Sequence, residues 1–212
     1  MASKKNKSSE QENKKDTALK VSRRGFLKGM GASAITTTLT SLPGLPASEA
    51  EAAVPAGMKE AVIRLTVNDQ PYRLKVKSNW TLLDVLRREL GLTGSKKSCD
   101  RGSCGACTVL LEGKPVYACS LLAIAMDGKK IHTVESLKTG EKLHPLQKAF
   151  SEQGGYQCGF CTPGVMMSAK ALLDENPNPD TEAIRQALAG NLCRCGAYPK
   201  ILESVLSAAS KA

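Results

Sequence analysis

The sequence contains few aromatic residues and little histidine. Aromatic side chains make up 4% of its 212 residues, and the only histidines are His132 and His144. Proteins that bind single-stranded nucleic acid stack bases on aromatic side chains within a basic groove, and no run of basic and aromatic residues is present here. Two histidines that lie far apart in the sequence offer no paired imidazole ligands, which a Rieske cluster needs on one iron. We therefore expect neither nucleic-acid binding nor a Rieske cluster.

The formal net charge of +10 is spread unevenly along the chain. Residues 1–52 contain nine Lys and Arg against five Asp and Glu, so the remainder carries an excess of only six basic residues. An excess of that size is weak evidence for a polyanionic partner.

A long uninterrupted apolar segment is also missing. Residues 29–46 are apolar but are interrupted by Gly, Ser, Thr and Pro. A membrane-spanning helix needs about 20 predominantly apolar residues. We therefore expect no stable membrane span, and we regard a membrane anchor as the weaker interpretation of this segment.

The N-terminal segment has the features of an export signal. Arg23 and Arg24 are followed by Gly-Phe-Leu-Lys, which resembles the twin-arginine signal of bacteria. The small residues at positions 47–52 suit cleavage by a signal peptidase. We expect residues 1–52 to form a twin-arginine signal peptide and flexible N-terminus, and the mature protein to reach the periplasm already folded. A plain basic tail is the alternative.

The eight cysteines would normally indicate four disulfides in an exported protein, but the spacing of the first four favours a metal. They follow a C-x4-C-x2-C pattern with a fourth cysteine after eleven residues, which is the plant-type 2Fe-2S ferredoxin spacing. Gly102 and Gly105 within the loop can adopt positive φ and bring backbone amides close to sulfur. Zinc usually uses paired knuckles instead, and three cysteines within nine residues cannot easily pair with one another. The four are Cys99, Cys104, Cys107 and Cys119.

The segments around this first group predict strands and one helix. Residues 61–67 and 72–77 alternate apolar and polar side chains about a short polar turn, which predicts a β-hairpin. Thr81 then precedes leucines and a valine spaced for one helix face over residues 82–90, and Gly91 is a suitable helix end.

The second four cysteines combine a C-x2-C with a C-x-C pair, and thirty-one residues lie between the two pairs. They are Cys158, Cys161, Cys193 and Cys195. The C-x2-C alone is similar to a thioredoxin dithiol, which would lie near a βαβ unit, but the surrounding pattern is helical. Helices are predicted over residues 144–152, 164–175, 181–189 and 197–209, with Asp180 as the N-cap of the third. Four short helices can bring the two cysteine pairs together in one pocket, and a C-x-C pair is too tight to favour tetrahedral zinc.

Three motifs carry a family resemblance. Residues 99–109, 157–164 and 191–196 resemble the iron-sulfur subunits of the xanthine oxidase family of molybdenum hydroxylases, and the similarity extends from residue 61 to about residue 207. The resemblance implies an α+β protein, with an N-terminal β-grasp 2Fe-2S ferredoxin-like domain at residues 60–136. A C-terminal four-helix-bundle 2Fe-2S-binding domain is expected at residues 140–210.

The resemblance also implies a role and partners. In such proteins the bundle cluster lies next to the molybdopterin of a large subunit, and the ferredoxin-like cluster faces the acceptor, usually an FAD subunit and otherwise a protein such as a cytochrome. Electrons would enter at the second cysteine group and leave through the first, and Gln157 and Cys195 would approach the pterin. Together with the export signal, the resemblance favours periplasmic aldehyde oxidoreductases, which oxidise aldehydes to carboxylic acids. The substrate chemistry would then belong to another polypeptide.

Two other functions are compatible with parts of the sequence. An exported binding module with four disulfides would use the same eight cysteines without any redox role. A free-standing ferredoxin would need only the first cysteine pattern, so the second pattern argues against it.

Overall fold

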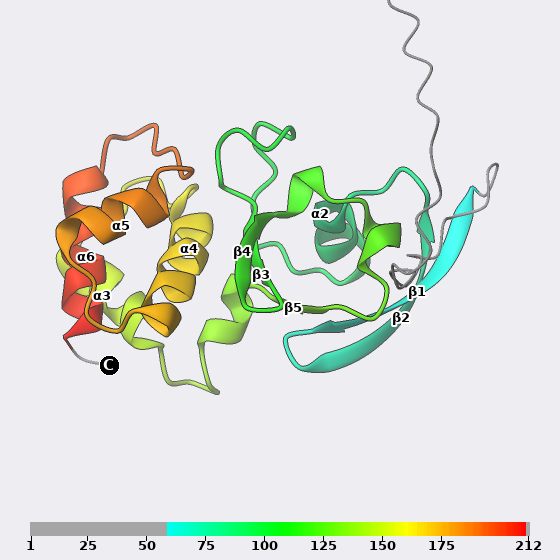
Figure 1. Cartoon of the computed structure of the whole chain (residues 1–212), viewed down its shortest axis with the longest axis horizontal. Helices are drawn as coiled ribbons and strands as arrows, with labels where there is room; N and C mark the ends of the chain where they lie inside the picture. The colour runs from blue at the N-terminus through cyan, green and yellow to red at the C-terminus, as the bar shows by residue number, and fades with distance from the viewer. Residues whose placement is uncertain (1–58, 211–212) are drawn as a thin grey trace, which may run out of the picture. The chain divides into compact units, whose positions relative to one another are not determined.

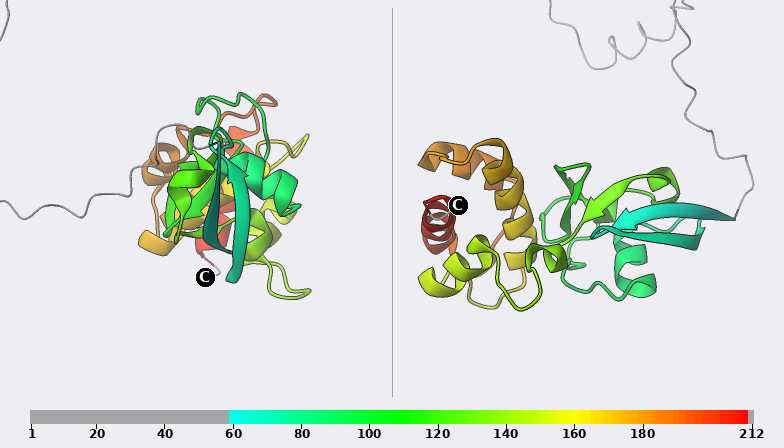
Figure 2. Two further views of the ribbon diagram at one scale, coloured as in Figure 1. Left: turned by 90° about the vertical axis from the view of Figure 1, so that its right-hand side faces the viewer. Right: turned by 90° about the horizontal axis from the view of Figure 1, so that it is seen from below.

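The computed structural model describes residues 59–210, which belong to one compact unit (Figure 1). The predicted signal peptide, including Arg23 and Arg24, lies outside the described residues. Within the described part, the five strands come before the four longer helices, and Figure 2 shows these later helices grouped beside the sheet.

The N-terminal part is built on a five-stranded mixed sheet. Strands β1 (Glu60–Val67) and β2 (Gln70–Lys77) form the predicted antiparallel hairpin, and Asn68 and Asp69 make its turn with positive φ values of 52° and 64°. The sheet order is β2-β1-β5-β3-β4, and β1 and β5 run parallel. The other strands are β3 (Thr108–Leu111), β4 (Lys114–Tyr117) and β5 (Lys130–His132).

The predicted first helix exists but changes its hydrogen-bonding pattern part-way. It begins as α2 (Leu82–Asp84) and continues as the π-helical turn η1 (Val85–Glu89). Thr81 caps it, because its hydroxyl accepts the Asp84 N–H while the Asp84 carboxylate accepts the Thr81 N–H. The apolar face of this segment packs against the buried face of the sheet, where the core side chains include Ile63, Leu65, Val76, Leu82 and Leu86. A mixed sheet covering a helix is the predicted β-grasp arrangement.

The C-terminal part contains the four predicted helices. They are α3 (Pro145–Gln153), α4 (Thr162–Glu175), α5 (Thr181–Leu188) and α6 (Tyr198–Ala209). Helix α3 packs against α6 and α4 against α5, around a core that includes Leu146, Phe150, Met167, Ile184 and Val205. Asp180 caps α5 as predicted, since its carboxylate accepts the Ala183 N–H at 2.7 Å. The fold class is therefore α+β, as expected.

None of the helices in residues 59–210 combines the length and apolar character that crossing a membrane requires.

Candidate metal centres

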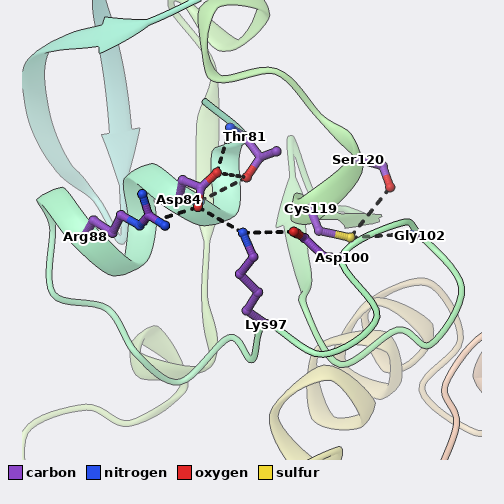
Figure 3. A network of polar contacts seen from close by, with 8 residues as sticks. All are labelled: Thr81, Asp84, Arg88, Lys97, Asp100, Gly102, Cys119 and Ser120. Atoms are coloured by element: carbon purple, nitrogen blue, oxygen red, sulfur yellow. Dashed lines mark hydrogen bonds and ion pairs between the residues drawn. The ribbon is translucent and has the colours of Figure 1, made fainter. Parts of the chain in front are cut away.

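The first cysteine group is held by a loop whose backbone turns back on its own sulfur atoms. Gly102 and Gly105 have φ values of 73° and 71°, as predicted. The Gly102 N–H donates to the Cys119 Sγ and the Ser103 N–H donates to the Cys99 Sγ, both at 3.3 Å (Figure 3 draws the first). Amide donors of this kind stabilise negative charge on sulfur, so the loop suits thiolate ligands.

Amide contacts and burial set different pKa values for the thiols of the first group. The backbone N–H groups of Arg101 and Ser103 lower the pKa of the Cys99 thiol to about 7. Burial raises the pKa of Cys107 to about 12. Metal binding needs thiolates, so an incoming metal displaces a proton far more readily from Cys99 than from Cys107.

The second cysteine group lies where two loops meet helix ends. Cys161 precedes α4 directly, and burial raises the pKa of its thiol to about 12. The Phe160 N–H, followed by the Cys195 thiol, lowers the pKa of Cys158. Burial alone would raise the pKa of Cys193, but contacts led by the Ala197 N–H lower it overall.

The thiols of each group lie close enough to affect one another's pKa: Cys104 affects both Cys99 and Cys107, and Cys193 affects both Cys158 and Cys161. A 2Fe-2S cluster has two irons, each held by two cysteines, whereas structural zinc needs four ligands around a single ion. All eight cysteines are free thiols, so each group can supply four thiolates. Four free thiols with the ferredoxin-type spacing fit one 2Fe-2S cluster in the first group, and the four thiols of the second group can hold another. Thiol–thiol hydrogen bonds within the groups join Cys99 with Cys104, Cys107 with Cys119, Cys158 with Cys195, and Cys161 with Cys193.

The two cysteine groups are in direct contact. The Leu192 N–H donates to the Cys104 carbonyl at 2.9 Å, and Leu192 immediately precedes Cys193. A cavity of about 400 Å³ has walls that include Cys104 from the first group and Cys158, Cys161 and Cys193 from the second. The fold therefore joins the ligand loops of both candidate centres.

Comparison with known proteins assigns both halves of the chain. A family model described as a 2Fe-2S iron-sulfur cluster binding domain matches residues 65–133, and a second 2Fe-2S binding domain model matches residues 133–206. The iron-sulfur-binding subunit PaoA of an Escherichia coli K12 aldehyde oxidoreductase is 39% identical over 211 residues, covering 91% of this chain and 90% of that protein. The chain belongs to the iron-sulfur subunits of the molybdenum hydroxylases.

A second relative and a solved structure are similar over about 70% of this chain. The small FeS subunit of the nicotinate dehydrogenase of Eubacterium barkeri is 45% identical over 148 residues, covering 70% of this chain and 94% of that protein. A crystal structure of quinoline 2-oxidoreductase from Pseudomonas putida 86 superposes with a TM-score of 0.70 and 40% identity, covering 72% of this chain and 96% of that one. The predicted resemblance is confirmed: this iron-sulfur subunit serves a multi-subunit oxidoreductase and has two 2Fe-2S-binding domains.

The residues expected near a partner's pterin lie on an accessible surface of the iron-sulfur subunit. Gln157 is exposed and Cys195 is half-buried. Large apolar side chains are exposed on the same loops and at the start of α6, among them Phe160, Leu192 and Tyr198. The approach of Gln157 and Cys195 to a pterin stays a prediction.

The two histidines lie elsewhere and are closer than their sequence separation suggests. His132 and His144 both line one cavity of about 420 Å³. The Nε2 atom of His132 is 3.4 Å from the Asp69 carboxylate, and the Nδ1 atom of His144 accepts the Leu146 N–H. Neither lines the cavity between the cysteine groups, whose walls include four of the cysteines.

Some residues of the iron-sulfur subunit were not predicted from sequence. Asn191 is buried and donates through its Nδ2 to the Gly105 carbonyl at 3.0 Å. Tyr198 accepts the Cys193 N–H on its hydroxyl at 2.9 Å. No sequence signal marks Tyr198, whereas an Asn beside a cysteine motif is at least a recognisable candidate for a loop contact.

Proposed function

We propose that this iron-sulfur subunit passes electrons from a molybdopterin-containing large subunit to an FAD subunit or another acceptor such as a cytochrome. The proposed reaction is oxidation of an aldehyde to a carboxylic acid on the large subunit. The observation that carries the electron-transfer role is the hydrogen bond from the Leu192 N–H to the Cys104 carbonyl. It links a residue adjacent to Cys193 directly to a cysteine of the other group.

The chain's own contribution is to hold the two centres close and fixed. When bound, each cluster can accept and release one electron at a time. Gly164 at the start of α4 lies so close to the first loop that an added Cβ would be 2.1 Å from the Gly105 carbonyl oxygen. Asn191 anchors the second loop to that same carbonyl at 3.0 Å. These contacts leave little freedom for the two ligand loops to move apart.

The aldehyde substrate is supported by similarity. PaoA belongs to an aldehyde oxidoreductase. The aldehyde oxidoreductase of Megalodesulfovibrio gigas is 46% identical over 149 residues, although this chain covers only 16% of that protein. Relatives named for nicotine 6-hydroxylase and caffeine dehydrogenase have comparable identity, 46% and 44%, so substrate identification needs the whole complex.

Export to the periplasm is supported by the twin-arginine pattern at Arg23 and Arg24. Folded export suits a subunit whose clusters are inserted before transport. Changing both arginines to Lys should leave the protein in the cytoplasm, as measured by fractionation and immunoblotting. Unchanged periplasmic accumulation would contradict this part of the proposal.

The electron-transfer role is tested with Cys193→Ser in the purified complex. We expect aldehyde to reduce neither the first cluster nor the distal acceptor, while dithionite still gives the electron paramagnetic resonance signal of the first cluster. That retained signal shows that the variant has folded. Normal acceptor reduction by aldehyde in Cys193→Ser would overturn the proposed role.

A further inference from the structure

A buried carboxylate outside both cysteine groups lies at the centre of a polar network. Asp84 has a side chain only 12% exposed. Its Oδ2 atom accepts the Thr81 hydroxyl at 2.8 Å and the Thr81 N–H at 3.2 Å (Figure 3). Its Oδ1 atom faces the Lys97 Nζ at 3.2 Å and the Arg88 Nε at 3.6 Å. The helix cap uses one oxygen of Asp84, and the other is directed at basic side chains.

Lys97 joins this buried carboxylate to the first cysteine loop. Its Nζ atom donates to the Asp84 Oδ1 at 3.2 Å and lies 3.0 Å from the Asp100 Oδ2. Asp100 follows Cys99 directly and has a φ of 55°. Left-handed backbone is uncommon outside glycine; Asp adopts it more readily than most residues, and a contact to its side chain adds support. The ammonium of Lys97 supplies such support through the Asp100 side chain.

The turn at Asp100 decides where the next amides point. The Ser103 N–H, three residues later, donates to the Cys99 Sγ at 3.3 Å. If the turn relaxes, this donor moves away from sulfur. Lys97 therefore acts on the Cys99 sulfur through the backbone turn at Asp100.

We propose that Lys97 is a positioning residue for the first cluster, holding Asp100 against Asp84 and offsetting the charge of both carboxylates. The proposal rests on the proposed function only in requiring that the first cysteine group binds a 2Fe-2S cluster. A cluster held by four thiolates becomes more negative by one unit when it gains an electron, so a nearby cation favours the reduced form and nearby carboxylates oppose it. Lys97 then raises the reduction potential of the site from which electrons leave the subunit.

An ordinary surface ion pair would not have this effect. Lys97 and Asp100 are 37% and 43% exposed, and exposed pairs contribute little to stability. Loss of Lys97 nevertheless leaves Asp84, which is mostly buried, without one of its two cationic neighbours. The distinguishing measurement is therefore a reduction potential, because a purely structural contact changes melting without changing that potential selectively.

The test is a redox titration of the purified complex followed by electron paramagnetic resonance, which reports both clusters at once. In Lys97→Gln, the ratio of reduced to oxidised first cluster at a fixed applied potential should fall about tenfold, equivalent to about 59 mV for one electron. In Asp100→Asn the ratio should rise, because Asn also adopts left-handed backbone and keeps the turn while the negative charge is lost. Lys97→Arg should keep most of the wild-type value. The second cluster should not shift. Lys75→Gln removes a lysine that pairs with Glu60 on the exposed hairpin and is the matched control.

Three outcomes distinguish a failure of the Lys97 proposal from a failure of the proposed function. A first-cluster potential in Lys97→Gln equal to that in Lys75→Gln overturns the role of Lys97. If Lys97→Gln does not retain the first cluster, the test passes to Asp100→Asn. A first-cluster potential in Asp100→Asn equal to that of the wild type then overturns the proposal. Absence of 2Fe-2S signals from the wild-type complex instead refutes the proposed function, so the two failures are distinguishable.

Discussion

Asn191 connects the loops of the two candidate centres, and replacing it with Ala should lower the unfolding free energy and weaken the contact between these loops. Asn191 is buried, with only 4% of its surface exposed. Its Nδ2 donates to the Gly105 carbonyl at 3.0 Å, and its Oδ1 accepts the Ser168 hydroxyl at 2.8 Å. In the Ala variant the Gly105 carbonyl still accepts the Thr108 hydroxyl at 2.7 Å. The Ser168 hydroxyl, in contrast, loses its hydrogen-bond acceptor.

The size of the effect follows from these contacts. One buried polar group without its partner, together with a small cavity, should cost about 2 to 3 kcal/mol of unfolding free energy. For a domain of this length, such a loss lowers the melting temperature by roughly 4 to 12 °C. Differential scanning calorimetry of the cluster-loaded subunit measures this change. Hydrogen exchange at the Leu192 amide should also become faster, because its bond to Cys104 loses a neighbouring anchor.

A matched control is available in Asn176→Ala. Asn176 is exposed at the end of α4, where its Oδ1 accepts the Asn178 N–H at 3.1 Å. Its replacement should change stability by no more than about 0.5 kcal/mol. Equal melting temperatures for the two variants, with unchanged exchange at Leu192, would refute the role given to Asn191.

Three further predictions concern packing, capping and thiol acidity. Gly164→Ala should lower the unfolding free energy by about 1 to 3 kcal/mol in urea titrations, because its new Cβ would meet the backbone carbonyl of Gly105 at 2.1 Å; a neutral effect would show that the two segments separate easily. Asp180→Ala should cost about 1 kcal/mol in the same assay, since it removes the side-chain cap of α5, and Asp180→Asn should restore most of the loss. In the metal-free protein, iodoacetamide should modify Cys99, with its pKa of about 7, much faster than Cys107, with its pKa of about 12. Peptide mass spectrometry would show the Cys99 rate falling about five-fold from pH 7 to pH 6, and equal rates for the two thiols would contradict the assigned environments.

Local sequence patterns predicted most of the fold because strands, turns and helix caps depend mainly on residues that are close in the sequence. The β1–β2 hairpin follows from period-two alternation around a turn, and the cap at Asp180 follows from the side-chain chemistry of Asp. The change from α2 to the π-helical turn at Val85–Glu89 was not predicted. Apolar spacing over so short a segment does not distinguish the two hydrogen-bonding patterns.

The cysteine sites were likewise predicted only in part from the sequence. Spacing sorted the eight cysteines into two groups, and the conformational freedom of glycine allowed the positive φ that Gly102 and Gly105 have. Contact between the groups depends on residues far apart in the chain: Asn191 and Gly105 are separated by 86 positions. The link from Asp84 through Lys97 to Asp100 likewise depends on how a helix and a loop pack. No periodicity encodes such contacts, so only the folded structure revealed them.

The central claim is that the eight cysteines hold two 2Fe-2S clusters. Its most direct test is the iron and acid-labile sulfide content of the purified subunit, with an electron paramagnetic resonance spectrum after dithionite reduction. We predict about four irons per chain and two distinguishable 2Fe-2S signals. Protein without iron, containing zinc or showing four disulfides by non-reducing mass spectrometry, would contradict the account.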